Sequence, residues 1–147
     1  MKWEAPSLAH FATDAGFPRS ILAGVVACAL ATSGGHDNYE LTAGVPGSGH
    51  WKGLWGLNVD RWAEYAELDL YDPRAAAAAA YRLTARTSSL RWCPAFDSGQ
   101  WKGYVPHVTG QLSFAPFGEA QHDPVTVVVH GAFGANDPTR LQRVSNG

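Results

Sequence analysis

The longest apolar run of the sequence spans residues 21–31, in which every residue is apolar or glycine. A helix that is apolar on all sides belongs in the middle of a core, so this run predicts a central buried helix. Before it, Gly16 suits the end of one helix and Pro18 suits the first turn of the next. After it, Ser33-Gly34-Gly35 predicts its end. We therefore expect one helix to end near Ala15 and the buried helix to begin near Pro18.

Thr32 lies at the last turn of this predicted helix. Its spacing from Ile21, Val25 and Cys28 places the four residues on one helical face. A residue at this position is expected where the buried helix leaves the core and reaches a cleft. Thr32 is therefore a candidate site residue.

Three patterns follow along the chain. Residues 34–53 are rich in glycine and predict a lobe of turns with a short hairpin. Asn58 can cap a short helix through about Leu68, and Asp72-Pro73 predicts a longer helix through about Thr87. Alanines at 75–80 give the longer helix high propensity and allow a neighbouring backbone to approach closely.

The pattern changes near residue 105. Glycine, proline and phenylalanine then follow in irregular order, and residues 125–129 predict a β-strand. A single strand is not stable alone, so we expect it to pair with the glycine-rich lobe or with another chain. The predicted organisation is a domain at 1–105 and an extension at 106–147.

Composition and charge exclude several classes. The 147 residues are 46% apolar, which is enough for one compact core. The net charge is −2 and the basic residues are scattered, so we expect no nucleic-acid partner. No apolar run approaches the roughly 20 residues of a membrane-spanning helix, and the first residues lack a signal-peptide pattern. The sequence thus predicts no membrane span and no export signal.

Cysteine and histidine usage gives little support to a metal centre. Cys28 and Cys93 are too few for a disulfide framework, and either two buried thiols or a single disulfide is compatible with them. The six histidines form no metal-ligand motif. We predict no metal and no cofactor.

Four motifs, in order, resemble the lytic transglycosylases and goose-type lysozymes. The resemblance covers about residues 5–104. The family pattern has a buried helix ending in Ala-Leu-Ala-Glu-Ser-Gly-Gly, then Gly-Leu-Trp-Gln-Ile-Asn, an Asp-Pro-led alanine-rich helix and a tryptophan-centred segment. In this chain the matching segments are Ala-Leu-Ala-Thr-Ser-Gly-Gly at 29–35, Gly-Leu-Trp-Gly-Leu-Asn at 53–58, Asp-Pro-Arg followed by alanines and Tyr at 72–81, and Arg-Trp-Cys-Pro at 91–94.

The resemblance implies a mainly α (α+β) fold. It would be a lysozyme-like helical domain with a glycine-rich loop lobe, a glycan groove between the two, and a short β-prone C-terminal extension. Aromatic faces pack on sugar rings, and Trp51 and Trp55 bracket the second motif within the loop lobe. The candidate groove residues are Ser33, Trp51, Trp55, Asn58 and Tyr81.

Thr32 stands where the family carries its catalytic glutamate. Glycosidic cleavage needs a proton from a carboxylic acid, and a hydroxyl is too weak an acid for this role. Gly56 and Ala76 also depart from the family, which has glutamine and asparagine there.

Asp37 and Glu40 are the candidate displaced acids, because the loop after Gly35 could fold back over the helix end. Weaker candidates are Asp60, Glu64 and Glu67 on a predicted surface helix, and Ser33 as a nucleophile with His36 as its base.

These departures predict a lysozyme-like domain that has lost its catalytic activity. The leading hypothesis is a non-catalytic phage virion protein of the tail or tail tip, assembled in the host cytoplasm, with other tail subunits as partners. It could also bind peptidoglycan or a related glycan. The first alternative is an active peptidoglycan-cleaving enzyme with a displaced acid, and the second is a soluble sugar-binding protein.

Overall fold

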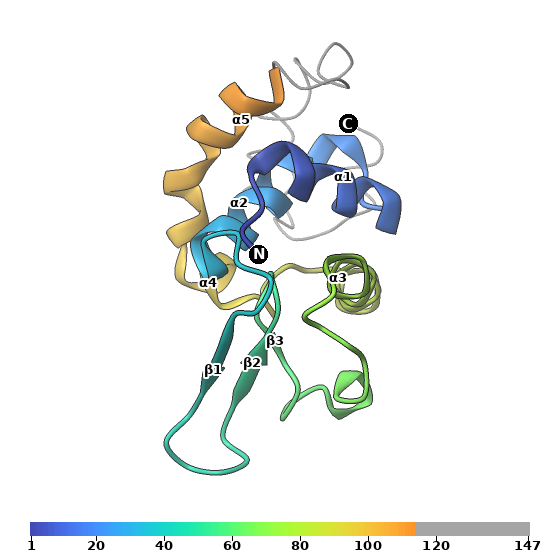
Figure 1. The fold of residues 1–147 in the computed structure, drawn as a ribbon, viewed down its shortest axis with the longest axis vertical. Coiled ribbons are helices and arrows are strands. Elements are labelled where there is room, and N and C mark those ends of the chain that lie inside the picture. Colours follow the sequence, from blue (N-terminus) through green and yellow to red (C-terminus); the bar gives the residue numbers. More distant parts are fainter. Residues whose placement is uncertain (114–147) are drawn as a thin grey trace.

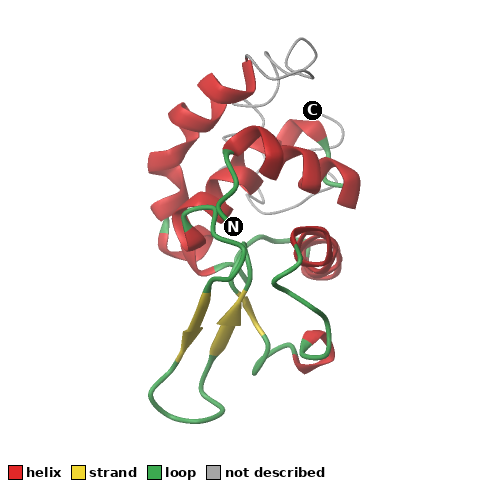
Figure 2. Cartoon of the chain, in the orientation of Figure 1, coloured by secondary structure: helices red, strands yellow, loops and turns green. Residues whose placement is uncertain are grey.

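A helical body and a small sheet make up the computed structural model, which describes residues 1–113. The body contains α1 (Ala5–Ala15), α2 (Leu22–Ser33), α3 (Pro73–Thr87), α4 (Pro94–Ser98) and α5 (Val105–Ser113). Short 3₁₀ turns lie at η1 (Arg19–Ile21), η2 (Ala63–Tyr65) and η3 (Gln100–Tyr104). The sheet extends from one end of the helical body, as Figures 1 and 2 show. The predicted strand at 125–129 lies outside the described residues.

Helix α2 is the centre of the core, as the apolar run predicted. Every residue from Leu22 to Ala29 is buried, and α1, α4, η3 and α5 all pack against it. The helix leaves the core over its last turn, where Leu30, Ala31 and Thr32 are half-buried. Gly34 ends it in a left-handed conformation, and its N–H donates to Leu30 O at 2.9 Å.

Helix α3 joins two hydrophobic clusters. Asp72 caps it by accepting a hydrogen bond from the Ala75 N–H, which confirms the helix predicted from Asp72-Pro73. On one face Ala76, Ala77 and Ala80 pack into the main core. On another face Ala79 and Leu83 contact a smaller cluster, whose other members are Leu57, Val59, Tyr65 and Leu70. The small alanine side chains thus let α3 pack closely on both sides.

The glycine-rich segment forms the predicted hairpin. Strands β1 (Glu40–Thr42) and β2 (His50–Lys52) pair antiparallel, and β3 (Leu57–Asn58) adds to the other edge of β2. The register places Leu41, Trp51 and Asn58 on one face of the sheet, because cross-strand partners point the same way. Glu40, His50 and Lys52 point to the opposite face.

The predicted helix from Asn58 to Leu68 is wrong. Asn58 Oδ1 does accept from the N–H groups of Asp60 and Arg61, as a helix cap would. The chain then forms only the 3₁₀ turn η2, because Tyr65 and Leu70 turn inward to the smaller hydrophobic cluster. Tertiary packing therefore overrides the local signal at this position.

Helix α5 crosses the boundary predicted at residue 105. Val108 and Leu112 are buried in the main core, where α5 packs on α1 and α2. The helical body thus continues at least to Ser113. The separate extension at 106–147 stays a prediction for the residues beyond it.

Candidate functional site

Thr32 contacts a buried thiol. Its Oγ1 lies 3.4 Å from Cys93 Sγ, and the Cys93 thiol donates to the Trp55 carbonyl at 3.3 Å. Cys93 is fully buried between the end of α2 and the start of α4. The hydroxyl at the position of the family acid is therefore held inside a network of neutral groups.

Cys28 and Cys93 are both buried free thiols, and each one affects the pKa of the other. Burial, with the contact to Cys93, raises the pKa of Cys28 well above its ordinary value. Burial also raises the pKa of Cys93, but hydrogen bonds from Cys28 and Thr32 and from the backbone of α4 outweigh it and leave the pKa below its ordinary value. The two cysteines that were 65 residues apart in the sequence therefore meet beneath Thr32.

Gly56 lies directly against Thr32. It has a φ of 61°, and a Cβ at this position would stand 2.7 Å from Thr32 Cγ2 and 3.6 Å from Tyr39 Cε2. Side chains of the chain itself therefore occupy the space beside Thr32. Burial first and the charge of Cys93 second raise the pKa of Tyr39.

A hollow of about 320 Å³ lies on the Trp51 face of the sheet, next to the C-terminal end of α3. Three tryptophans line it, together with two arginines and three small polar residues. We name it the tryptophan groove, and its lining residues are Trp51, Asn58, Arg61, Trp62, Thr87, Ser89, Arg91 and Trp92. None of these described residues is acidic.

Internal contacts position the aromatic rings of this groove. The Trp92 indole N–H donates to Thr84 Oγ1 at 2.9 Å, and Thr84 is itself buried in α3. Arg61 and Arg86 stack on the Trp62 ring, with their guanidinium carbons 4.9 and 5.5 Å from its centroid. Arg86 also pairs with Glu64. Two of the three rings are thus fixed before any ligand arrives.

The structure brings two of the predicted groove residues together, Trp51 and Asn58. They are cross-strand partners and line the same hollow. Asn58 Oδ1 also accepts from the His50 N–H, so its amide is oriented by the sheet. Their contact with a glycan stays a prediction.

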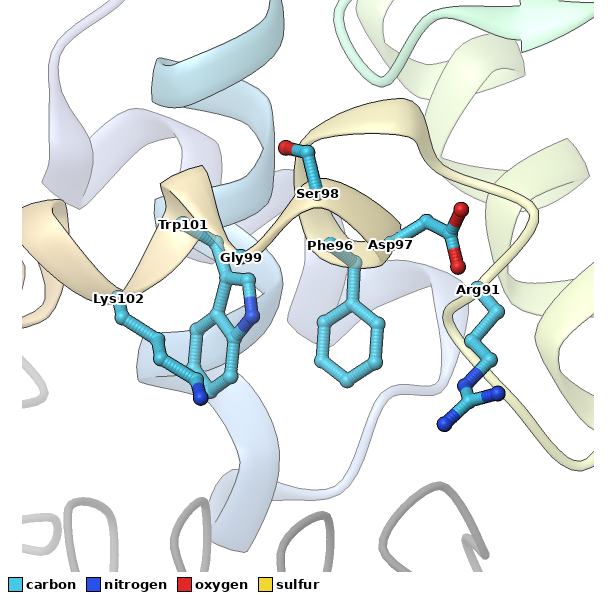
Figure 3. A pocket seen from close by; sticks show the side chains of 7 residues that line it. All are labelled: Arg91, Phe96, Asp97, Ser98, Gly99, Trp101 and Lys102. Atoms are coloured by element: carbon cyan, nitrogen blue, oxygen red, sulfur yellow. The ribbon is translucent and has the colours of Figure 1, made fainter.

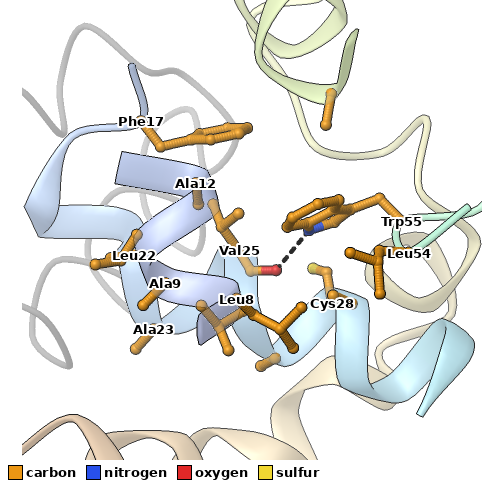
Figure 4. Close-up of a cluster of buried hydrophobic side chains, with 14 of the residues drawn as sticks. Leu8, Ala9, Ala12, Phe17, Leu22, Ala23, Val25, Cys28, Leu54 and Trp55 are labelled. Carbon is orange, nitrogen blue, oxygen red and sulfur yellow. Dashed lines mark hydrogen bonds between the residues drawn. The ribbon is translucent and has the colours of Figure 1, made fainter. Parts of the chain in front are cut away.

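The structure places three other predicted groove residues elsewhere. Trp55 is only 1% exposed, and Figure 4 shows its indole N–H directed to the Val25 carbonyl, at 2.9 Å. Ser33 is buried and serves the end of α2, because its hydroxyl donates to Ala29 O and accepts from the Gly35 N–H. Tyr81 packs edge-on against Phe17, with ring centroids 5.3 Å apart. These corrections share one cause, since each side chain completes local packing.

Asp37 and Glu40, the candidate displaced acids, are both engaged in hydrogen bonds. Asp37 accepts from the Met1 amino group at 2.9 Å and from the Trp3 indole at 3.0 Å. Burial raises the pKa of Asp37, but these hydrogen bonds outweigh it and leave the pKa lowered. Hydrogen bonds from Tyr71 and then His50 lower the pKa of Glu40. A general acid needs the opposite shift.

Sequence reasoning missed six of the eight groove residues, and four of these six are Arg61, Trp62, Arg91 and Trp92. Both tryptophans also pack against the smaller hydrophobic cluster. The available signal was the repeated Arg-Trp dipeptide at 61–62 and 91–92. A cation next to an aromatic ring is a common arrangement at polar binding surfaces.

Comparison with known families decides the relationship. The model of the lysozyme-like domain family matches residues 9–93, which is more than half of the chain. The chain belongs to the lysozyme-like domain family. The helical body and three-stranded sheet agree with the α+β fold expected of this family. No curated protein and no solved structure gives a significant match.

Within residues 1–113, no helix has the length and apolar character to cross a bilayer. In the same range, no three side chains of His, Cys, Asp or Glu are grouped so that they could hold a metal ion.

Proposed function

We propose that this lysozyme-like protein binds a glycan of the peptidoglycan type in the tryptophan groove and does not cleave it. The family links the chain to glycans of this kind. The observation that carries the proposal is the lining of the groove, with three tryptophans, two arginines and no acidic side chain among the described residues. Aromatic rings supply faces for sugar rings, and an acid is what hydrolysis would require.

The absence of cleavage is supported by the groups around Thr32. Its hydroxyl contacts Cys93, and a thiol and a hydroxyl do not replace a carboxylic acid as proton donor near neutral pH. The displaced-acid alternative is less well supported, because the pKa values of Asp37 and Glu40 are lowered and both carboxylates already accept hydrogen bonds. The loss of general acid catalysis alone costs about 10² to 10⁴-fold in rate.

Sedimentation with insoluble peptidoglycan tests binding and cleavage in one experiment. We expect the protein to pellet with the glycan and to release no soluble muropeptides. Trp51→Ala should weaken binding about thirty-fold, which corresponds to about 2 kcal/mol for a tryptophan at a binding hot spot. Trp3→Phe is the matched control, because Trp3 lies outside the groove. Binding that is unchanged by Trp51→Ala would overturn the assignment of this groove.

Muropeptide release decides between the binding protein and the enzyme. Release by the unmodified protein that is abolished by Asp37→Asn or Glu40→Gln would establish a displaced acid and contradict the proposal. The sedimentation experiment also separates a glycan-binding role from a purely structural one.

A place in a phage tail remains a prediction from the family resemblance, and detection of the chain in purified virions by mass spectrometry would test it.

A further inference from the structure

The six tryptophans fall into two groups according to their indole N–H. The N–H of Trp3 donates to Asp37, that of Trp55 to Val25 O and that of Trp92 to Thr84. Those of the other three have no acceptor within the described residues, and these three are Trp51, Trp62 and Trp101. Each of them lines a hollow. Trp51 and Trp62 belong to the tryptophan groove, whereas Trp101 lines a second hollow.

The second hollow has a volume of about 470 Å³ and is formed by Arg91 and by residues of α4 and η3. Figure 3 shows the side chains of Lys102, Trp101, Phe96 and Arg91 extending to the same side of the backbone, with a cation at each end of the aromatic pair. The rings of Phe96 and Trp101 stack with centroids 5.0 Å apart. We name it the Arg91–Lys102 hollow.

Arg91 lines both hollows, so the tryptophan groove and the Arg91–Lys102 hollow both border this side chain. A ligand held on the tryptophans can therefore reach the second hollow without leaving the surface. Every residue of the second hollow except Arg91 lies beyond the segment that matches the lysozyme-like family. The family match consequently assigns them no role.

Among residues 1–113, no hydrogen bond or ion pair engages the side-chain N–H donors of this hollow, which belong to Arg91, Trp101 and Lys102. Trp101 is 5% exposed, and leaving a buried N–H without an acceptor costs about 1–3 kcal/mol. Figure 3 shows its indole nitrogen on the ring edge nearer to Phe96. Arg74 and Arg86 pair with carboxylates, whereas Arg91 and Lys102 form no ion pair among residues 1–113. Two cations and a buried N–H that have no partner in the described part of the chain are suited to an oxyanion.

Asp97 adds an acceptor to the same hollow. Its carboxylate is exposed, and it forms no ion pair with Arg91 or with any other described residue. The hollow therefore presents positive and negative groups side by side. A phosphate would meet repulsion from Asp97, whereas a short peptide offers carboxylates to the cations and N–H or ammonium groups to Asp97.

We propose that the Arg91–Lys102 hollow binds the peptide substituent of a glycan whose sugars lie in the tryptophan groove. This inference rests on the proposed function and specifies its ligand as a glycan that carries an acidic peptide. Arg91 contacts the ligand at the junction of the two hollows. Lys102 and the Trp101 N–H hold a peptide carboxylate, and Asp97 accepts from a peptide nitrogen.

Isothermal titration of the full chain with two soluble glycans tests the proposal. One is a muropeptide with its peptide stem, and the other is the same disaccharide after amidase removal of the stem. We expect the peptide-bearing ligand to bind about ten-fold tighter, as one charge-assisted hydrogen bond allows. Inorganic phosphate is the third ligand, and we expect it to leave the preference for the peptide-bearing glycan unchanged.

Two variants address the hollow without touching the tryptophan groove. Lys102→Met removes a cation, and Trp101→Phe keeps an aromatic ring, though a smaller one, and removes the N–H. Both should reduce affinity for the peptide-bearing glycan about ten-fold and leave affinity for the peptide-free glycan unchanged. Arg82→Met is the matched control, because Arg82 is an exposed cation of α3 outside both hollows.

The possible failures are distinguishable. The peptide subsite is overturned if the unmodified protein binds the two glycans with equal affinity, or if Lys102→Met lowers the affinity for both glycans equally. Either result leaves the proposed function standing. Phosphate that binds the unmodified chain but not Lys102→Met, and that competes with both glycans alike, overturns the peptide in favour of an anion site. No binding of either glycan overturns the proposed function and this subsite together.

Discussion

Thr32 and Gly56 are in direct contact, and a Cβ at position 56 would stand only 2.7 Å from Thr32 Cγ2. These are two of the three positions at which the chain departs from the lysozyme-like pattern. The methyl group of Thr32 occupies the space that a larger residue at 56 would need, while its hydroxyl contacts Cys93. The two departures therefore form one packed arrangement. Thr32, which stands where the family has its acid, is therefore packed against Gly56 and Cys93.

The contact predicts coupling between the two positions. Gly56→Ala should destabilise the protein by about 2 kcal/mol, because the φ of 61° disfavours a side chain and the new Cβ meets Thr32. Thr32→Ser removes Cγ2 and keeps the hydroxyl, so Gly56→Ala should cost about 1 kcal/mol less in that background. Urea unfolding of the unmodified protein, the two single variants and the double variant measures the coupling. Strictly additive free energies would show that the contact carries no strain.

The buried cysteines predict a specific pattern of thiol reactivity. Cys28 and Cys93 are both fully buried and free. In the native protein we expect neither thiol to react with an aromatic disulfide reagent within minutes, because the reagent needs access to the sulfur. After unfolding without reductant, two equivalents should react. A count of zero after unfolding would mean that the pair is a disulfide in solution.

The hydrogen bond of Trp55 predicts a difference between two otherwise similar substitutions. Trp55→Phe removes a donor to the Val25 carbonyl and leaves a gap in the core, with an expected loss of about 1–3 kcal/mol of unfolding free energy. Trp51→Phe should be close to neutral, because its N–H has no acceptor among the described residues and its ring is half-buried. Thermal or urea unfolding compares them, and equal losses would contradict the role given to the Trp55 N–H.

Glu40 predicts a dependence of stability on pH. Its pKa lies below the ordinary value of 4.5, because Tyr71 first and His50 second donate to the carboxylate. The stability that it contributes is therefore present above pH 4.5 and is lost as the pH falls through the lowered pKa of the folded state. Unfolding of the unmodified protein and of Glu40→Gln at several pH values between 7 and 2.5 should show a gap that closes at low pH.

Glu67→Gln is the matched control for this pH dependence. Glu67 is exposed, and the described residues give it no ion pair or hydrogen bond. Its substitution should shift the stability little, because an exposed carboxylate without a partner in the described residues contributes little to stability. A gap between the unmodified protein and Glu40→Gln that stays constant from pH 7 to 2.5 would contradict the role given to the Glu40 carboxylate.

Local signals in the sequence predicted α1, α2, α3 and the hairpin, but not α4 or α5. The apolar run gave α2, Asp72-Pro73 gave α3 with its cap, and the glycine-rich segment gave β1 and β2. The one wrong helix, at 58–68, followed a correct capping signal at Asn58 that tertiary packing then overrode. Family membership could also be predicted, because it rests on short motifs in a fixed order.

The site was predicted only in part. Trp51 and Asn58 line the tryptophan groove, whereas Trp55, Ser33 and Tyr81 do not. A tryptophan in a glycine-rich lobe can face a groove or the core, and its position in the sequence does not distinguish these environments. The environment depends on whether the indole N–H has an acceptor in the core. Trp55 donates to Val25 O there, whereas Trp51 has no acceptor among the described residues.

The sequence by itself thus determined the buried helix, the place of Thr32 in its last turn and the identity of the residue that replaces an acid there. These features depend on neighbours within a few turns of the chain. Only the tertiary structure decided what surrounds Thr32, because Gly56 and Cys93 come from segments 24 and 61 positions further along. Contacts between such distant segments are set by how whole helices and strands pack, and a local pattern does not encode which side chains will meet.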